Sequence, residues 1–87
     1  MNTVRIGYTN AKGVTLKVGD TIMWKYGALE APEYSKITSF SYDGSWCNME
    51  STDPEYAGIG EACESDKIKD FFNPYETGVG AYLYEDR

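Results

Sequence analysis

Residues 34–50, YSKITSFSYDGSWCNME, carry the clearest structural signal in this chain of 87 residues. Two segments suited to β-structure, 34–42 and 46–50, flank the dipeptide Asp43-Gly44. Asp-Gly between two such segments favours the tight turn of a β-hairpin, because Gly adopts a positive φ without steric cost. The sequence therefore predicts an antiparallel pair of strands joined by a turn at residues 42–45.

Alternation of polar and apolar residues, typical of half-buried strands, recurs on both sides of this hairpin. It predicts further strands at residues 4–8, 14–18, 22–26, 61–64 and 79–84, the first two joined by a turn at 9–13. A helical period is found only at 65–72, where Ser65 is the predicted N-cap and Asn73-Pro74 stops the helical turn. We expect an all-β fold, a small antiparallel barrel with one short helical turn near residues 65–72.

The apolar positions of these segments predict the core. We expect much of it to come from Val4, Ile6, Leu16, Val18, Ile22, Trp24, Ile37, Phe40, Ile68 and Leu83. Residues 1–87 are expected to form a single domain, since a chain this short seldom divides into independent units. Two Trp and eight Tyr among 41% hydrophobic residues argue against intrinsic disorder.

The run LKVGDTIMW, residues 16–24, resembles the opening of many SH3-like small β-barrels. The segments that follow fit the same plan as far as residue 70, while the first and last predicted strands are additions to it. The resemblance implies a small barrel fold. It leaves the function open, because such barrels bind peptides, nucleic acids and other proteins through different surfaces.

Charge is distributed unevenly along the chain. Residues 1–38 carry five basic and three acidic side chains, a net charge of +2, whereas residues 39–87 carry three basic and eleven acidic ones, a net charge of −8. Nucleic-acid binding depends largely on Lys and Arg that neutralise phosphates, so a net charge of −6 disfavours it. An acidic surface of this kind instead indicates a basic protein partner.

Catalytic and metal-binding signatures are weak. The chain has no histidine, which removes the commonest general base near neutral pH. Cys47 lies beside Trp46, and Cys63 is flanked by acids that raise a thiol pKa, so neither suits a nucleophile. Acidic pairs from residues 50–64 can be imagined in glycoside hydrolysis, but acids around a loop are more often a solvated rim.

The remaining acidic, glycine and cysteine motifs do not complete a recognised site. The acids of residues 50–61 lack the spacing of a calcium loop. Gly58-Ile59-Gly60 and Gly78-Val79-Gly80 lack the rest of a phosphate-binding fingerprint. The two cysteines are expected to be free thiols, since no secretion signal is recognised. We therefore predict no enzyme activity, no cofactor and no metal, and a cytoplasmic location without a membrane-spanning segment.

In being short, acidic, tyrosine-rich and single-domain, the chain resembles the small inhibitors that bacteriophages make against host nucleases, repair enzymes or CRISPR effectors. The resemblance implies a non-catalytic module, in the host cytoplasm, whose acidic surface imitates nucleic acid and occupies a basic surface of a nucleic-acid-processing enzyme. The alternative is an assembly module that acts by oligomerising. We expect no direct nucleic-acid or membrane binding and a monomer or homodimer.

The predicted partner-binding residues are acids and tyrosines of the second half of the chain. They are Glu50, Asp53, Glu55, Tyr56, Glu61, Glu64, Asp66 and Tyr75. Further aromatic side chains for docking are expected from residues 71–84, Tyr82 and Tyr84 among them, because aromatic anchors within a polar rim are typical of interfaces.

Overall fold

The predicted central hairpin is confirmed in the computed structural model, which describes residues 6–27, 30–69 and 80–84. Strands β4 (Glu33–Phe40) and β5 (Trp46–Ser51) pair antiparallel on either side of the Asp43-Gly44 turn. Gly44 adopts the positive φ of 80° that the turn requires, and its amide donates to the Ser41 carbonyl at 2.9 Å. The turn residues therefore set the register of the two longest strands.

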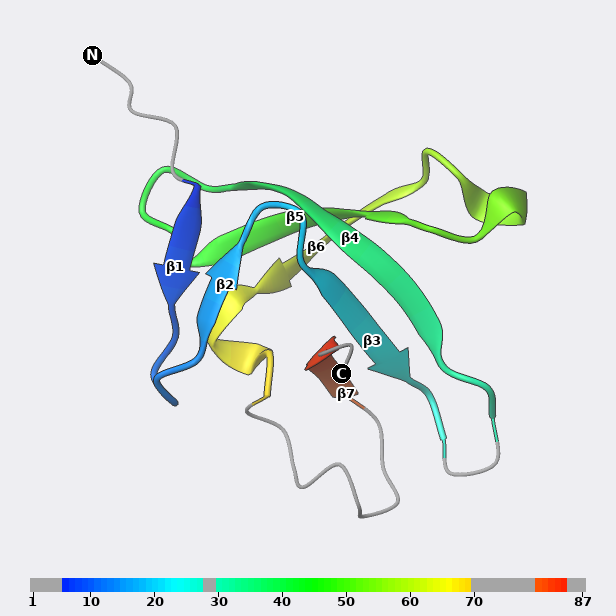
Figure 1. Ribbon diagram of the computed structural model, residues 1–87, viewed down its shortest axis with the longest axis horizontal. Helices are drawn as coiled ribbons and strands as arrows, with labels where there is room; N and C mark the ends of the chain where they lie inside the picture. Colours follow the sequence, from blue (N-terminus) through cyan, green and yellow to red (C-terminus); the bar gives the residue numbers. More distant parts are fainter. Residues whose placement is uncertain (1–5, 28–29, 70–79, 85–87) are drawn as a thin grey trace.

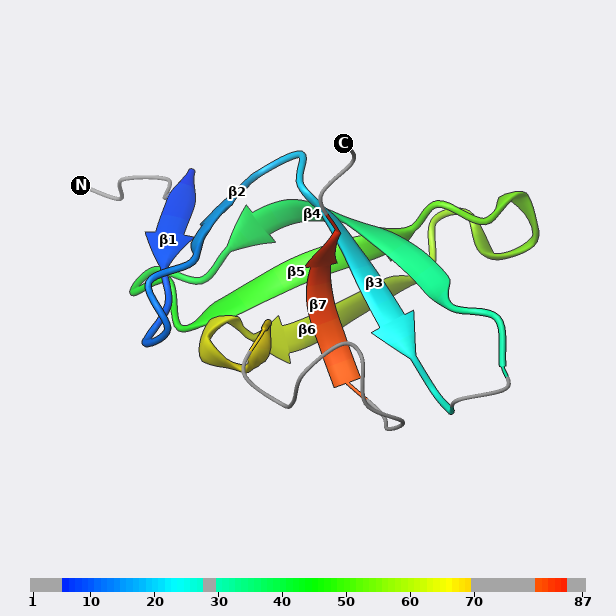
Figure 2. The same ribbon diagram turned by 60° about the horizontal axis from the view of Figure 1, so that its bottom comes forward.

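Five of the strands form one antiparallel sheet. Its order is β6 (Gly60–Glu64), β5, β4, β3 (Thr21–Lys25) and β7 (Gly80–Tyr84). A bulge in β4 between Ile37 and Ser39 bends this sheet, because an extra residue on one strand increases the local twist. The sheet curls into a half-barrel in which β7 crosses in front of β5 and β6 (Figure 2). The prediction of an all-β fold is confirmed, with 52% of the described residues in strands.

A second, two-stranded ribbon lies at one end of the half-barrel. It is formed by β1 (Gly7–Thr9) and β2 (Thr15–Lys17), which pair antiparallel as predicted. A short 3-10 helix, η1 (Pro54–Tyr56), lies at the opposite end of the long axis (Figures 1 and 2). The molecule therefore has a ribbon end and a η1 end, and the curled sheet runs between them.

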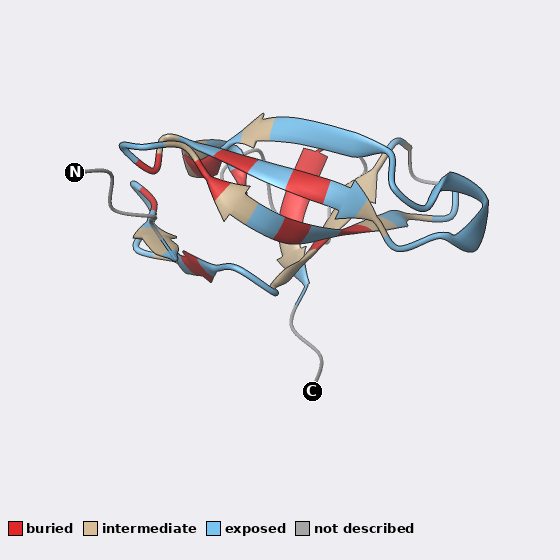
Figure 3. Ribbon diagram, turned by 90° about the horizontal axis from the view of Figure 1, so that it is seen from above, coloured by how far each residue is buried: buried red, intermediate tan, exposed pale blue. Residues whose placement is uncertain are grey.

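The core fills the concave face of the sheet, as buried residues at every second position of the central strands show (Figure 3). Its members are Leu16, Ile22, Ile37, Phe40, Cys47, Met49, Ile68 and Ala81, with Trp24 and Leu83 partly buried against them. Cys47, Met49 and Ala81 were not predicted. Val4 lies outside the described residues.

Two predicted core residues are exposed instead. Ile6 is 75% exposed and Val18 is 44% exposed. The Val18 amide donates to the Ile6 carbonyl at 3.0 Å, so the two residues meet where the ribbon leaves the sheet, and Gly19 (φ 99°) then turns the chain toward β3. The predicted alternation holds within β2, where Leu16 is buried between the exposed Thr15 and Lys17. Val18, one residue beyond the strand, is no longer covered by the core that buries Leu16.

The predicted helical turn is present but short. Helix η2 is a 3-10 turn of three residues (Ser65–Lys67), and Ile68 is already extended, with ψ 125°. The prediction that Ser65 caps this turn is wrong: Glu64 occupies the N-cap position, and the buried Ser65 hydroxyl donates to the Gly44 carbonyl at 2.6 Å. Phe71 and Phe72 lie outside the described residues.

The segment 65–69 joins three parts of the fold. The Asn10 side-chain amide donates to the Ile68 carbonyl at 2.7 Å, and the Asp66 carboxylate accepts from the Ala11 amide at 2.7 Å. The Lys69 amide donates to the Ala81 carbonyl of β7 at 3.2 Å. These bonds hold the ribbon and β7 against the end of β6. Nowhere in the described ranges is there a helix with the length and apolarity needed to cross a membrane.

Candidate functional site

Strand pairing divides the predicted acidic residues between the two faces of the sheet. Glu61 lies directly opposite Met49 and points to the concave face, since residues facing each other across antiparallel strands share a face and Met49 is buried. Glu64 lies opposite the exposed Trp46, and Glu50 follows Met49 in β5, so both point to the convex face. The predicted site residues therefore do not form one surface.

Asp53, Glu55 and Tyr56 gather in the loop that carries η1. Asp53 is its N-cap, and its carboxylate accepts from the Glu55 amide at 2.9 Å, while Pro54 occupies the first turn. This arrangement is favourable because Pro has no amide to satisfy there. Tyr56 is 47% exposed, and its carbonyl accepts from the Ile59 amide at 3.0 Å. The loop thus holds its aromatic side chain on a local hydrogen-bonded frame.

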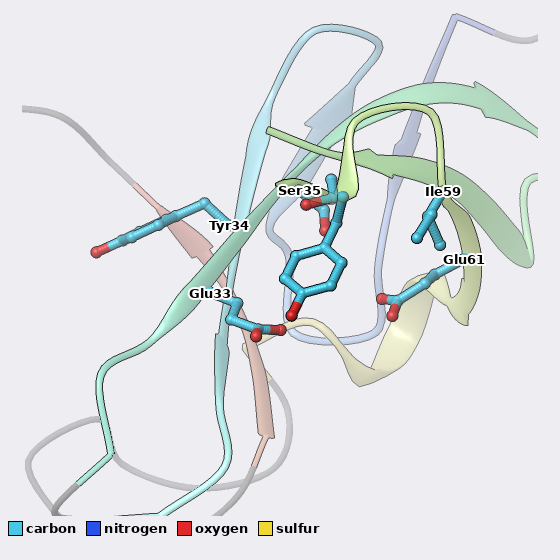
Figure 4. Close-up of a pocket in the computed structure, with 7 residues that line it drawn as sticks. Glu33, Tyr34, Ser35, Ile59 and Glu61 are labelled. Atoms are coloured by element: carbon cyan, nitrogen blue, oxygen red, sulfur yellow. The ribbon is translucent and has the colours of Figure 1, made fainter. Parts of the chain in front are cut away.

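A pocket of about 140 Å³ opens beside this loop, where β4 begins, β5 ends and β6 begins. Its lining residues are Glu33, Tyr34, Ser35, Ser51, Tyr56, Ile59 and Glu61. The carboxylates of Glu33 and Glu61 enter it from opposite strands, while the Tyr34 ring points away from it (Figure 4). The buried Ser35 hydroxyl accepts from the Trp24 indole at 3.1 Å, which fixes one wall of the pocket.

A tyrosine hydroxyl lies within the field of the two pocket carboxylates. The pKa of Tyr26 is raised by partial burial first, then by the negative charges of Glu61 and Glu33 and by hydrogen bonding to Glu33. Two carboxylates from different strands can pair with one ammonium or guanidinium group, and the exposed Tyr56 adds an aromatic surface. The chemistry of the pocket therefore favours a cationic side chain.

The remaining predicted residues lie elsewhere. Glu50 is opposite Lys36 on the convex face, which places a cation next to it. Asp66 accepts from the Tyr8 hydroxyl at 3.2 Å as well as from Ala11, so its carboxylate stabilises the ribbon. Tyr75 lies outside the described residues. Of the predicted residues that the structure describes, only Glu61 and Tyr56 line the pocket.

Aromatic residues of β7 also differ from the prediction. Tyr82 is 2% exposed and cannot serve as a docking side chain as it stands. Tyr84 is 42% exposed, and its ring meets that of Tyr34 edge-on, with the centroids 5.1 Å apart. Sequence reasoning missed the pocket's second carboxylate, Glu33, and the tyrosine that both carboxylates act on, Tyr26. Both belong to the first half of the chain, whose net charge is positive, whereas the predicted site was taken from the acidic second half.

The two cysteines face each other across β5 and β6 as free thiols. Burial, followed by the neighbouring Cys47 and two glutamates, raises the pKa of Cys63 to about 11, and burial also raises that of Cys47. Both thiols are therefore protonated and unreactive near neutral pH. In the part of the chain that the structure describes, no three Cys, Asp or Glu side chains are arranged to hold a metal ion.

No family model, curated protein or solved structure matches this chain.

Proposed function

We propose that this protein is a non-catalytic interaction module that binds a basic surface of a partner protein through its η1 end. The observation that supports this most directly is the meeting of Glu33 and Glu61 across a pocket whose rim includes the exposed Tyr56 and Ile59. Carboxylates that receive a cation, beside aromatic and aliphatic anchors, are the elements of a compact binding site. Asp53 and Glu55 extend its negative charge along the loop.

The partner class that fits is a nucleic-acid-processing enzyme, whose groove carries the Lys and Arg side chains that normally contact phosphates. The module occupies this groove and so acts as an inhibitor or regulator of the phage type. Between residues 37 and 66 the chain contains no Lys or Arg, so the charge presented around η1 is of one sign. Such a field speeds encounter with a basic surface and weakens as salt rises.

Two charge-reversal pairs test the proposal. Glu33→Lys with Glu61→Lys reverses the charge of the pocket. A control pair, Glu30→Lys with Glu50→Lys, makes the same change in net charge on exposed acids that belong neither to the pocket nor to β6. Wild type and both pairs are immobilised and loaded with bacterial lysate, and bound proteins are released by a salt gradient. We expect the pocket pair to lose the salt-sensitive partner and the control pair to retain it.

The identity of the retained protein provides the second reading. A nucleic-acid-processing enzyme that a DNA duplex displaces from the module supports the proposed partner class. Equal retention by wild type and the pocket pair, or equal loss by the two pairs, contradicts a site at the η1 end. Salt-resistant recovery of the protein alone, as high oligomers in size-exclusion chromatography, supports the assembly alternative instead.

A further inference from the structure

Strand β6 leaves one side of its backbone open. Two hydrogen bonds, one just before β6 and one just after it, show which of its residues bond to β5. The Ser51 amide donates to the Ile59 carbonyl at 3.1 Å, and the Ser65 amide donates to the Ser45 carbonyl at 2.8 Å. Bonded and non-bonded pairs alternate along an antiparallel ladder, so the odd-numbered residues of β6 bond to β5. The amides of Gly60, Ala62 and Glu64 and the carbonyls of Gly60 and Ala62 therefore point to the outer side, where no strand of the described chain pairs with them.

The open side is suited to pairing. The register of β5 with β6 runs through five consecutive pairs without a bulge, and β6 contains neither Pro nor Lys. Proteins usually blunt an exposed edge with one of these devices. Four of the five β6 residues are exposed, and Cys63 is the half-buried one. The other edge of the sheet differs, because the Lys69 amide already bonds to the Ala81 carbonyl of β7.

Charge selects what can pair there. An incoming strand would place one set of side chains beside Glu61 on the concave face and the alternate set beside Glu64 on the convex face. Gly60 and Ala62 add no bulk between these acids, which leaves room for long side chains. Opposite charges on neighbouring strands stabilise a pair and like charges destabilise it. The complementary strand therefore carries Lys or Arg at intervals.

A second copy of this chain fits the edge poorly. Antiparallel pairing of two β6 strands about Ala62 would set the Glu61 side chains of the two copies diagonally beside each other, between molecules that each carry a net charge of −6. We propose that β6 binds an extended, basic segment of the partner as a sixth strand of the sheet. The inference rests on the proposed function for the sign of the partner's charge, and it adds the mode of binding: backbone pairing, with the lysines or arginines alternating between the two faces.

Amide hydrogen exchange, followed residue by residue by NMR, tests the docking strand. The probe is a short peptide with lysine at every third position and threonine between, so that successive lysines lie on opposite faces of the strand. It is compared with the same peptide carrying N-methylated backbone amides. Both peptides have the same charge, but the second cannot donate main-chain hydrogen bonds. We expect the first to slow exchange at Gly60, Ala62 and Glu64 by about tenfold or more, and to bind at least about tenfold more tightly than the second.

A substitution on the protein gives a parallel reading. Ala62→Pro removes an outward amide that β5 does not use, whereas Ala62→Val keeps it and suits a strand. The Pro variant should bind the peptide about tenfold more weakly than the Val variant. Should the Pro variant unfold, the comparison of the two peptides on the wild-type protein still decides the question.

Each contrary result separates this inference from the proposed function. Equal binding of the two peptides, or no binding of either, overturns the docking strand, and the pocket pair in the lysate assay then judges the proposed function by itself. Protection of the same three amides that grows with protein concentration, in the absence of peptide, overturns the basic occupant in favour of a second copy. Peptide pairing at β6 combined with full partner retention by Glu33→Lys alone, which leaves the β6 acids in place, supports the strand and contradicts the pocket.

Discussion

Asn10 should contribute more to stability than any exposed polar side chain of this protein. It is 4% exposed, and its side-chain amide nitrogen donates to the Ile68 carbonyl at 2.7 Å. Its side-chain oxygen accepts from the Lys12 amide at 3.0 Å and from the Val14 amide at 2.9 Å. One side chain thus closes the turn of the ribbon and attaches the ribbon to the segment after β6.

The size of the effect follows from these three bonds. A hydrogen bond contributes about 0.5–1.5 kcal/mol net, and leaving a buried polar group without its partner costs about 1–3 kcal/mol. Asn10→Ala removes the donor to Ile68 and the acceptor for two turn amides. We expect it to lower the free energy of unfolding by about 3 kcal/mol, a large part of the roughly 4–13 kcal/mol typical of a chain this long.

Asn10→Asp provides a more specific test. It keeps an acceptor for the Lys12 and Val14 amides but sets a carboxylate oxygen against the Ile68 carbonyl. At neutral pH this variant should be at least as unstable as Asn10→Ala, because a charge is then buried beside an acceptor. The difference between its free energy of unfolding and that of wild type should shrink as the pH falls, since a protonated carboxyl can again donate to the Ile68 carbonyl.

Urea unfolding followed by tryptophan fluorescence measures all of these variants. Asn48→Ala is the matched control, because Asn48 is exposed and its side-chain amide donates to the Ser39 hydroxyl at 3.1 Å. We expect this control to stay within about 0.5 kcal/mol of wild type. An Asn10→Ala variant as stable as the control, or an Asn10→Asp deficit that does not change with pH, would refute the role given to Asn10.

Three titrations give further predictions. The pKa of Asp43 is lowered from 3.8 to about 2, chiefly by hydrogen bonds from the Ser45 hydroxyl and amide. The carboxylate therefore stabilises the folded protein above pH 3.8, and this stabilisation is lost as the pH falls toward 2. Asp43→Asn should flatten this part of the acid-unfolding curve. The pKa of Cys63 is raised to about 11, so the free energy of unfolding should fall as the pH rises from 9.0 toward 11. Iodoacetamide should label this thiol slowly at neutral pH, and rapid labelling would contradict its burial. The pKa of Tyr26 is raised above 10.0 by burial and then by the charge of Glu61, so Glu61→Gln should lower it. A phenolate absorbance titration measures this pKa, and Tyr26→Phe identifies the signal. An unchanged midpoint would contradict the proximity of Tyr26 and Glu61.

The hairpin could be predicted from sequence because its information is local. Asp43 and Gly44 supply the turn geometry themselves, and the Asp43 carboxylate accepts bonds from Ser41 and Ser45, which lie within two residues of it. Their apolar character then placed Ile37 and Phe40 correctly in the core. The bulge after Ile37 was not visible in the pattern, although it is what keeps both residues on the concave face.

The binding site could not be predicted in the same way, because it depends on which strands become neighbours. Glu33 and Glu61 are far apart in sequence, and they meet only because β5 lies between β4 and β6. Conversely, Glu61 and Glu64 are close in sequence but point to opposite faces, since three steps along a strand reverse the side. A count of charges along the chain contains neither fact.

The same alternation gives the acids of β6 two functions at once. An open edge that lacks Pro, Lys and a bulge risks pairing with copies of itself. Pairing of two copies about Ala62 would set the two Glu61 side chains diagonally beside each other on the concave face, and the net charge of −6 adds long-range repulsion. A basic strand meets attraction at the positions where a second copy meets repulsion. The charge that keeps this edge open in solution is therefore also what would select its partner, which explains how a small domain can carry an unprotected strand and still be specific.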